Sequence, residues 1–102
     1  MILYGDTSAL LKLYIQEAGT ETVQEAIAAS DSVTTHVIAY PELRAALAKA
    51  ARVGRIDSDH LQALVADLHS DWPYFQTLGV DQQMVNRAGE LAHQYGLRGY
   101  DS

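Results

Sequence analysis

The sequence contains no cysteine, which excludes disulfide bonds, thiolate nucleophiles and cysteine-ligated metal centres. It also lacks a long hydrophobic run. Lys12 interrupts the apolar stretch near the start, which is therefore far shorter than the ~20 residues that a membrane span needs. No basic region precedes the apolar residues 1–4, as it would in a signal peptide. We therefore expect a soluble, cytoplasmic protein whose fold rests on the burial of apolar side chains.

The length and composition are those of one small globular domain. The chain has 102 residues, of which 48% are hydrophobic and 20% are charged, and these proportions argue against wholesale disorder. A chain of this size can bury one modest core. We therefore expect residues 1–102 to form a single domain.

Basic residues are scarce. Thirteen acidic and seven basic side chains give a formal net charge of −6, which by itself counts against a general nucleic-acid binder. The objection is removed if several carboxylates gather around divalent cations, because bound metal ions reverse the local field and can meet a phosphate.

Short apolar runs alternate with segments of helical periodicity. Strands are expected at residues 2–4, 32–35 and 77–80. Thr22-x-x-Glu25 has the pattern of a capping box, and Pro41 is tolerable only near the first turn of a helix. Alternation of this kind predicts an α/β fold with a parallel sheet covered by helices on both sides. Helices are expected from Thr7 to before Gly19, from Thr20 or Thr22, over residues 37–53 with apolar Leu43, Ala46, Leu47 and Ala50, from Ser58, and after Asp81.

Three carboxylates stand at strand ends or helix starts. Asp6 follows the first strand, Glu42 follows Pro41, and Asp101 follows the turn-like residues 97–100. Each is explained equally well as a helix cap or as a partner of the helix dipole. The functional alternative uses the same geometry, because ligands of parallel sheets bind outside the carboxyl ends of the strands.

The pattern around these carboxylates is similar to that of VapC-type PIN-domain ribonucleases. Residues 2–14, ILYGDTSALLKLY, resemble the family's opening, residues 41–47, PELRAAL, resemble its second motif, and residues 97–101, LRGYD, resemble its third. The resemblance covers the whole chain and implies a PIN-like, RNase H-like or Rossmann-like three-layer fold. Gly5 departs from the family, which usually has an apolar residue there, and predicts a less packed strand end.

The resemblance implies a site and a chemistry. It makes Asp6, Glu42 and Asp101 the catalytic residues of a Mg²⁺-dependent endoribonuclease, with Asp6 and Asp101 as direct metal ligands and Mn²⁺ as a possible substitute. Glu42 would bind through water or orient the attacking water. Ser8 and Arg44 are candidates for substrate binding. The implied partners are RNA and a VapB-type antitoxin that blocks the site.

Family members continue past the position of Asp101 and commonly carry a fourth acidic residue there. The resemblance therefore predicts a domain that is incomplete after its third strand and the helix that follows. It also predicts an exposed apolar edge at residues 2–4, which invites a homo-oligomer. The alternative function is that of a catalytically inactive PIN fragment that only binds an antitoxin or itself.

Other features of the sequence are weaker evidence for a function. Two rival enzyme or signalling classes fail, because a haloacid-dehalogenase phosphatase needs an aspartate where Ser8 stands and a receiver domain needs an acidic pair near its start. The basic residues Arg44, Lys49, Arg52 and Arg55 form either a phosphate-contacting patch or, more simply, a solvated face. The histidines His36, His60, His69 and His93 lack metal-ligand spacing, and surface or capping roles are expected for them.

Overall fold

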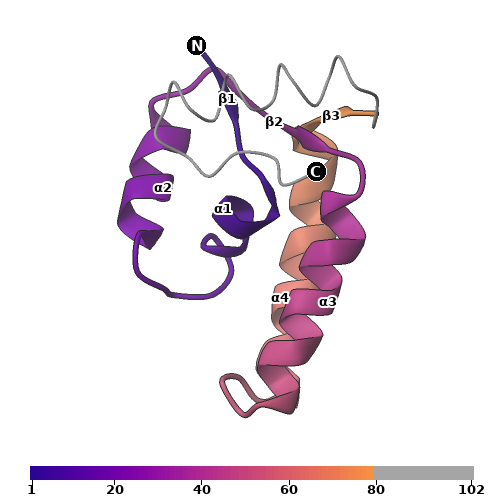
Figure 1. The fold of residues 1–102 in the computed structure, drawn as a ribbon. Coiled ribbons are helices and arrows are strands. Elements are labelled where there is room, and N and C mark those ends of the chain that lie inside the picture. Colours follow the sequence, from indigo (N-terminus) through magenta and orange to yellow (C-terminus); the bar gives the residue numbers. More distant parts are fainter. Residues whose placement is uncertain (80–102) are drawn as a thin grey trace.

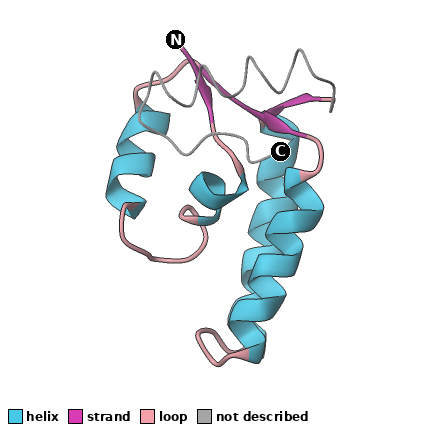
Figure 2. Cartoon of the chain, viewed as in Figure 1, coloured by secondary structure: helices cyan, strands magenta, loops and turns pink. Residues whose placement is uncertain are grey.

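The computed structural model describes residues 1–79, which form three strands, four α-helices and one 3₁₀ helix (Figures 1 and 2). The strand–helix alternation expected from the sequence is confirmed over this part of the chain. The elements are β1 (Ile2–Tyr4), α1 (Thr7–Leu11), α2 (Thr20–Ala28), β2 (Ser32–His36), α3 (Ala39–Arg52), α4 (Ser58–Asp71), η1 (Trp72–Tyr74) and β3 (Gln76–Leu78).

The three strands form a parallel sheet in the order β1-β2-β3. Leu3 pairs with Val33 across the first ladder, and the backbone N–H of Gly5 donates to the carbonyl of Thr34 at 3.0 Å, so the pairing continues one residue past β1. The helices α1 to α4 all lie below the strands in Figure 1. A parallel α/β sheet is thus confirmed, and its strands bring their carboxyl ends to one edge.

The core lies between β2 and the helices. Val33 packs with Leu10 from α1, and Leu43 and Leu47 of α3 and Leu68 of α4 have no exposed surface. Burying a leucine side chain stabilises a fold by roughly 1.5–3 kcal/mol, so this cluster fixes α3 and α4 against α1. The apolar stripe expected on the third helix is confirmed at Leu43, Leu47 and Ala50, and Ala46 is partly buried.

Two expectations about helix ends were wrong. The first helix ends at Leu11 rather than just before Gly19, because the N–H groups of Leu13 and Tyr14 bond to carbonyls three residues back and tighten the chain into turns. The second helix begins at Thr20, the first of the two expected starts, directly after Gly19, whose φ of 91° only glycine adopts readily. Thr22 therefore lies inside α2, and the expected capping box does not form.

Other expectations hold or lie outside the described residues. Pro41 is the third residue of α3, within its first turn, as predicted. The third strand begins one residue earlier than expected, at Gln76. The helix expected after Asp81 lies outside residues 1–79, so the expected helical cover on both sides of the sheet stays a prediction. Within that range no helix is both long and apolar enough to cross a membrane.

Candidate functional site

Asp6 lies at the carboxyl end of β1 and caps α1. Its Oδ1 accepts the backbone N–H of Ala9 at 2.9 Å, and its carbonyl accepts the N–H of Leu10 at 3.0 Å. The residue is only 6% exposed. The capping role is therefore real, and it places a buried carboxylate at the edge of the sheet where ligands of parallel folds bind.

Glu42 occupies the first turn of α3, which begins shortly after β2. Its Oε1 accepts a hydrogen bond of 2.6 Å from the hydroxyl of Thr7, the first residue of α1. The Glu42 side chain is half-exposed at 51%. The hydrogen bond joins the starts of two helices 35 residues apart. The structure thus brings the Asp6 and Glu42 segments together at one edge of the sheet.

His36 is the last residue of β2 and a neighbour of Glu42. Its Nε2 lies 3.8 Å from Glu42 Oε1, and its side chain is 7% exposed. Burial lowers the pKa of His36, and the negative charge of Glu42 opposes that shift. The expected surface or capping role was wrong for His36, although His60 and His69 are exposed as expected. Its position at a strand end, six residues before Glu42, was the available signal.

The two candidate substrate-binding residues lie differently. Ser8 is the second residue of α1, half-buried and two residues after Asp6. Arg44 follows Glu42 by two residues, and residues two apart on a helix do not face each other. Its Nη1 donates to the Tyr40 hydroxyl at 3.3 Å, and its guanidinium carbon lies 5.9 Å from the ring centroid. The structure therefore keeps Ser8 beside Asp6 and directs Arg44 toward Tyr40.

Asp101 and His93 lie outside the described residues. Within residues 1–79, no group of three or more histidine, aspartate or glutamate side chains is arranged to hold a metal ion. The described part of the chain supplies two carboxylates, Asp6 and Glu42, at one edge. Carboxylate oxygens are the ligands that hard divalent cations such as Mg²⁺ prefer, and a Mg²⁺ site usually needs only one or two of them. The donor chemistry fits such a cation.

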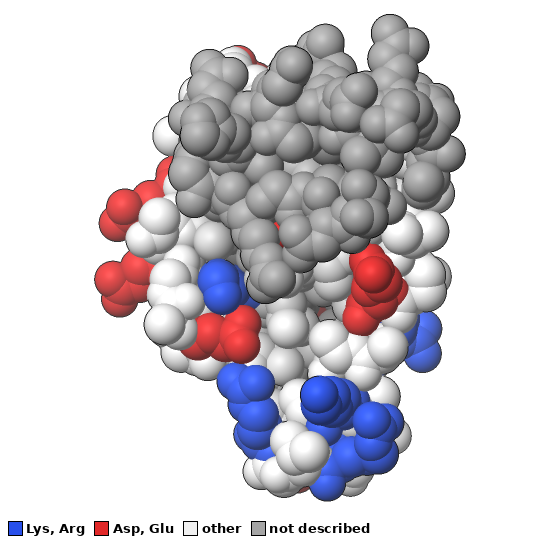
Figure 3. Space-filling model, viewed as in Figure 1, with Lys and Arg blue, Asp and Glu red and all other residues white. Residues whose placement is uncertain are grey.

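The basic side chains are distributed away from this edge. In Figure 3, lysine and arginine gather at the end of the α3–α4 hairpin farthest from the strands. Lys49 and Arg52 lie in the last turn of α3. Arg55 approaches Glu17 at 3.8 Å, and Lys12 approaches the same carboxylate at 3.5 Å. These pairs are partly exposed, with separations of 3.5 Å or more, and pairs near the surface contribute little to stability, which favours the solvated-face interpretation of the basic residues.

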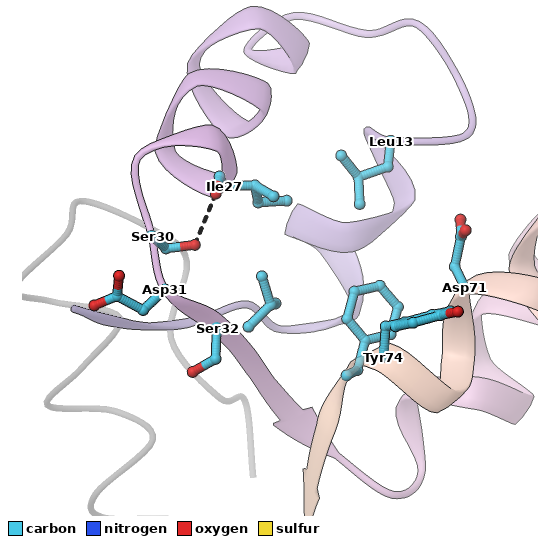
Figure 4. Close-up of a pocket in the computed structure, with 9 residues that line it drawn as sticks. Leu13, Ile27, Ser30, Asp31, Ser32, Asp71 and Tyr74 are labelled. Atoms are coloured by element: carbon cyan, nitrogen blue, oxygen red, sulfur yellow. Dashed lines mark hydrogen bonds between the residues drawn. The ribbon is translucent and has the colours of Figure 1, made fainter.

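Two hollows lie apart from Asp6 and Glu42. One, of about 380 Å³, opens between the end of α2 and η1, where Ile27 and Ser30 face Asp71 and Tyr74 (Figure 4). Ser30 is held there by a 2.8 Å hydrogen bond from its hydroxyl to the carbonyl of Ile27. The other, of about 590 Å³, runs along α3 and α4 beside Tyr40, Arg44 and His69.

The chain has the parallel sheet of an α/β protein, and proteins of this class bind ligands at the carboxyl ends of their strands. Asp6 and the start of the Glu42 helix lie at that edge. The chain belongs to the PIN-domain family, whose model matches residues 3–102. The resemblance seen in the sequence motifs is thereby confirmed.

Relatives span nearly the whole chain. This chain is 33% identical over 105 residues to Ribonuclease VapC45 of Mycobacterium tuberculosis (strain CDC 1551 / Oshkosh). The alignment covers 99% of this chain and 70% of the relative. The values for Ribonuclease VapC49 of Mycobacterium tuberculosis (strain ATCC 25618 / H37Rv) are the same. Ribonuclease VapC3 of Pyrobaculum aerophilum (strain ATCC 51768 / DSM 7523 / JCM 9630 / CIP 104966 / NBRC 100827 / IM2) is 29% identical over 104 residues, which cover all of this chain and 77% of the relative.

Proposed function

We propose that this protein is a Mg²⁺-dependent endoribonuclease toxin that cleaves RNA phosphodiester bonds and is neutralised by a cognate antitoxin. The observation that carries the proposal is the hydrogen bond between Thr7 and Glu42, because it joins the segment of Asp6 to the segment of Glu42 at the ligand-binding edge of the sheet. Membership of the PIN family and the names of the relatives support the ribonuclease assignment.

In this proposal Asp6 and Asp101 hold the metal ion, and Mn²⁺ substitutes for Mg²⁺. When bound, the ion would lower the pKa of a water molecule and neutralise charge on the phosphate. Asp6 suits the role because it places a buried carboxylate at the carboxyl end of β1, and carboxylate oxygens are ligands that Mg²⁺ prefers. No cysteine or histidine nucleophile is needed for chemistry of this kind.

The remaining roles belong to side chains around the carboxylates. Glu42 orients the attacking water, for which its half-exposed position is suited. Ser8 contacts the substrate near Asp6. Arg44 contacts the RNA backbone from the α3 surface, which requires it to leave Tyr40 when RNA binds.

We also propose the partners that such an activity requires. A VapB-type antitoxin protein would cover the acidic edge and keep RNA away from Asp6. We also propose a cytoplasmic location, since the proposed substrate is RNA. A homo-oligomer is expected because β1 is paired only with β2 among the described strands.

The decisive experiment compares RNA cleavage by the purified protein and by Asp6→Asn, which keeps the shape of the side chain but removes its charge. We expect cleavage to require Mg²⁺ or Mn²⁺, to stop in EDTA, and to fall by at least about 100-fold in the variant. Asp59→Asn is the matched control, because Asp59 is exposed at the start of α4.

Cleavage that persists in EDTA or in Asp6→Asn would show that the proposed chemistry is wrong. A wild-type protein that binds the antitoxin but cleaves no RNA under any metal condition would favour the binding-only alternative. Glu42→Gln should lower cleavage as well, since the amide cannot accept a proton from water.

A further inference from the structure

Thr7 is close to the proposed site but has no assigned role in it. Its hydroxyl lies 2.6 Å from Glu42 Oε1, within the range of short hydrogen bonds to a charged carboxylate. A threonine at the start of a helix often uses its hydroxyl oxygen to accept a backbone N–H bond as a cap. Here Asp6 already caps α1 through Ala9, so the Thr7 hydroxyl can serve the neighbouring helix instead.

Glu42 needs such a contact to adopt one orientation. Its side chain has several rotatable bonds and is 51% exposed, so packing alone does not fix it. His36 Nε2 lies 3.8 Å from Glu42 Oε1, beyond hydrogen-bond distance. Threonine is stiff about its first side-chain torsion because it is β-branched. The Thr7 hydroxyl is therefore a rigid donor on one oxygen of a mobile carboxylate.

We propose that Thr7 is a positioning residue that holds the Glu42 carboxylate in the orientation needed to act on the attacking water. Within residues 1–79, no hydrogen bond or ion pair engages Glu42 Oε2. Thr7 occupies Oε1 and leaves Oε2 for the water. The inference rests on the proposed function, since it concerns the same site, but the orientation of Glu42 can be tested without cleavage.

The test uses two variants that remove the hydroxyl and one that keeps it. Thr7→Val preserves the β-branched shape, Thr7→Ala gives a second removal with high helix propensity, and Thr7→Ser retains the donor. Thr22→Val is the matched control, because Thr22 is an exposed threonine within α2. Thermal unfolding establishes which variants are folded.

We expect Thr7→Val and Thr7→Ala to lower kcat by between about tenfold and 100-fold with little change in KM, because the error is one of orientation. Thr7→Ser should retain most of kcat, and Thr22→Val all of it. In a Glu42→Gln background, removal of the hydroxyl should cause little further loss, since the two residues act as a unit. The Mg²⁺ concentration for half-maximal rate should stay close to the wild-type value.

A second measurement needs no activity. Side-chain scalar couplings of Glu42, measured by NMR on the metal-free protein, should report one rotamer in the wild type and in Thr7→Ser, and averaged rotamers in Thr7→Val and Thr7→Ala. Unchanged couplings, or full kcat in both removal variants while Asp6→Asn is inactive, would overturn the role of Thr7 and leave the ribonuclease proposal standing. A wild type without cleavage but with the expected couplings would overturn the ribonuclease proposal and leave the positioning of Glu42 by Thr7 intact.

Discussion

At Asp6, the structure confirms one of the two interpretations that the sequence left as alternatives, the helix cap, and the metal-binding role stays a prediction. The cap joins Oδ1 of Asp6 to the backbone N–H of Ala9 at 2.9 Å. It fixes the carboxylate near the strand end, where ligands of parallel sheets bind. A buried carboxylate held by a backbone N–H group is well prepared for a cation, because little side-chain freedom remains to be lost.

His36 shows what burial does to a residue that looks ordinary in the sequence. It ends β2 with 7% of its side chain exposed, and desolvation lowers its pKa while Glu42 opposes that shift. The lowered pKa makes a charged imidazole less favourable at this position, 3.8 Å from Glu42 Oε1.

Gly5 lies where an added side-chain atom would press on the core. A Cβ added there would lie 3.1 Å from Cδ2 of Leu10, a fully buried core side chain, so the neighbour would have to move. The expectation of a less packed strand end was wrong, since Leu10 fills that space. We predict that Gly5→Ala lowers the free energy of unfolding by about 1–2 kcal/mol, measured by urea denaturation.

Gly79→Ala is the matched control for this prediction. Among the residues that the structure describes, a Cβ at Gly79 would meet nothing within 4 Å, so the substitution should change the free energy of unfolding by less than about 0.5 kcal/mol. Equal effects at the two glycines would contradict the packing explanation.

Among the elements, the short helix α1 is tied to the rest of the fold by the turns that follow it. Tyr14 is buried there, and its hydroxyl donates to Asp71 Oδ2 at 2.8 Å, at the end of α4. Burial and then the hydrogen bond to Asp71 raise the pKa of Tyr14. The phenol therefore stays protonated as a donor and links the segment after α1 to α4 across 57 residues.

The link between Tyr14 and Asp71 gives a prediction at the scale of the elements. Tyr14→Phe keeps the ring in the core but removes the donor, and should lower the free energy of unfolding by about 1 kcal/mol in denaturant titration. Tyr74→Phe serves as the control, because Tyr74 is 85% exposed and should tolerate the loss of its hydroxyl. A Tyr14→Phe variant as stable as the wild type would mean that the hydrogen bond contributes nothing net.

At the scale of the whole molecule, the edge of the sheet at β1 is the feature that bears on self-association. Within residues 1–79, β1 pairs with β2 alone, and Ile2 on that strand is 46% exposed. An apolar strand edge is a template for pairing with another chain. We predict that the protein self-associates, which multi-angle light scattering over a concentration series will detect as a mass above that of the monomer.

Ile2→Lys should reduce this association, because a charge on an edge strand opposes strand pairing. Val53→Lys is the control: Val53 is 63% exposed just past the end of α3, far along the chain from the edge. A wild type that remains monomeric at high concentration would contradict the role assigned to the β1 edge. Equal effects of Ile2→Lys and Val53→Lys would contradict it as well.

The sequence by itself determined the order of the strands and α-helices within residues 1–79 and the local positions of Asp6 and Glu42. The periodicity of residues 43–50 predicted the buried face of α3, and the apolar run of residues 2–4 placed Asp6 at a strand end. Such features depend on neighbours within a few residues, so the sequence carries them directly. The three motifs were likewise sufficient to predict the PIN family, which the comparison confirmed.

Only the tertiary structure decided which side chains meet. The hydrogen bond from Thr7 to Glu42 spans 35 residues, and its existence depends on how α1 and α3 pack on the sheet. The same packing buries His36, and its position at the end of β2 was the local feature that set it apart from the exposed His60 and His69. Local patterns specify which residues lie on a buried face, whereas contacts between faces arise from the packing of the whole core, which no short stretch of sequence encodes.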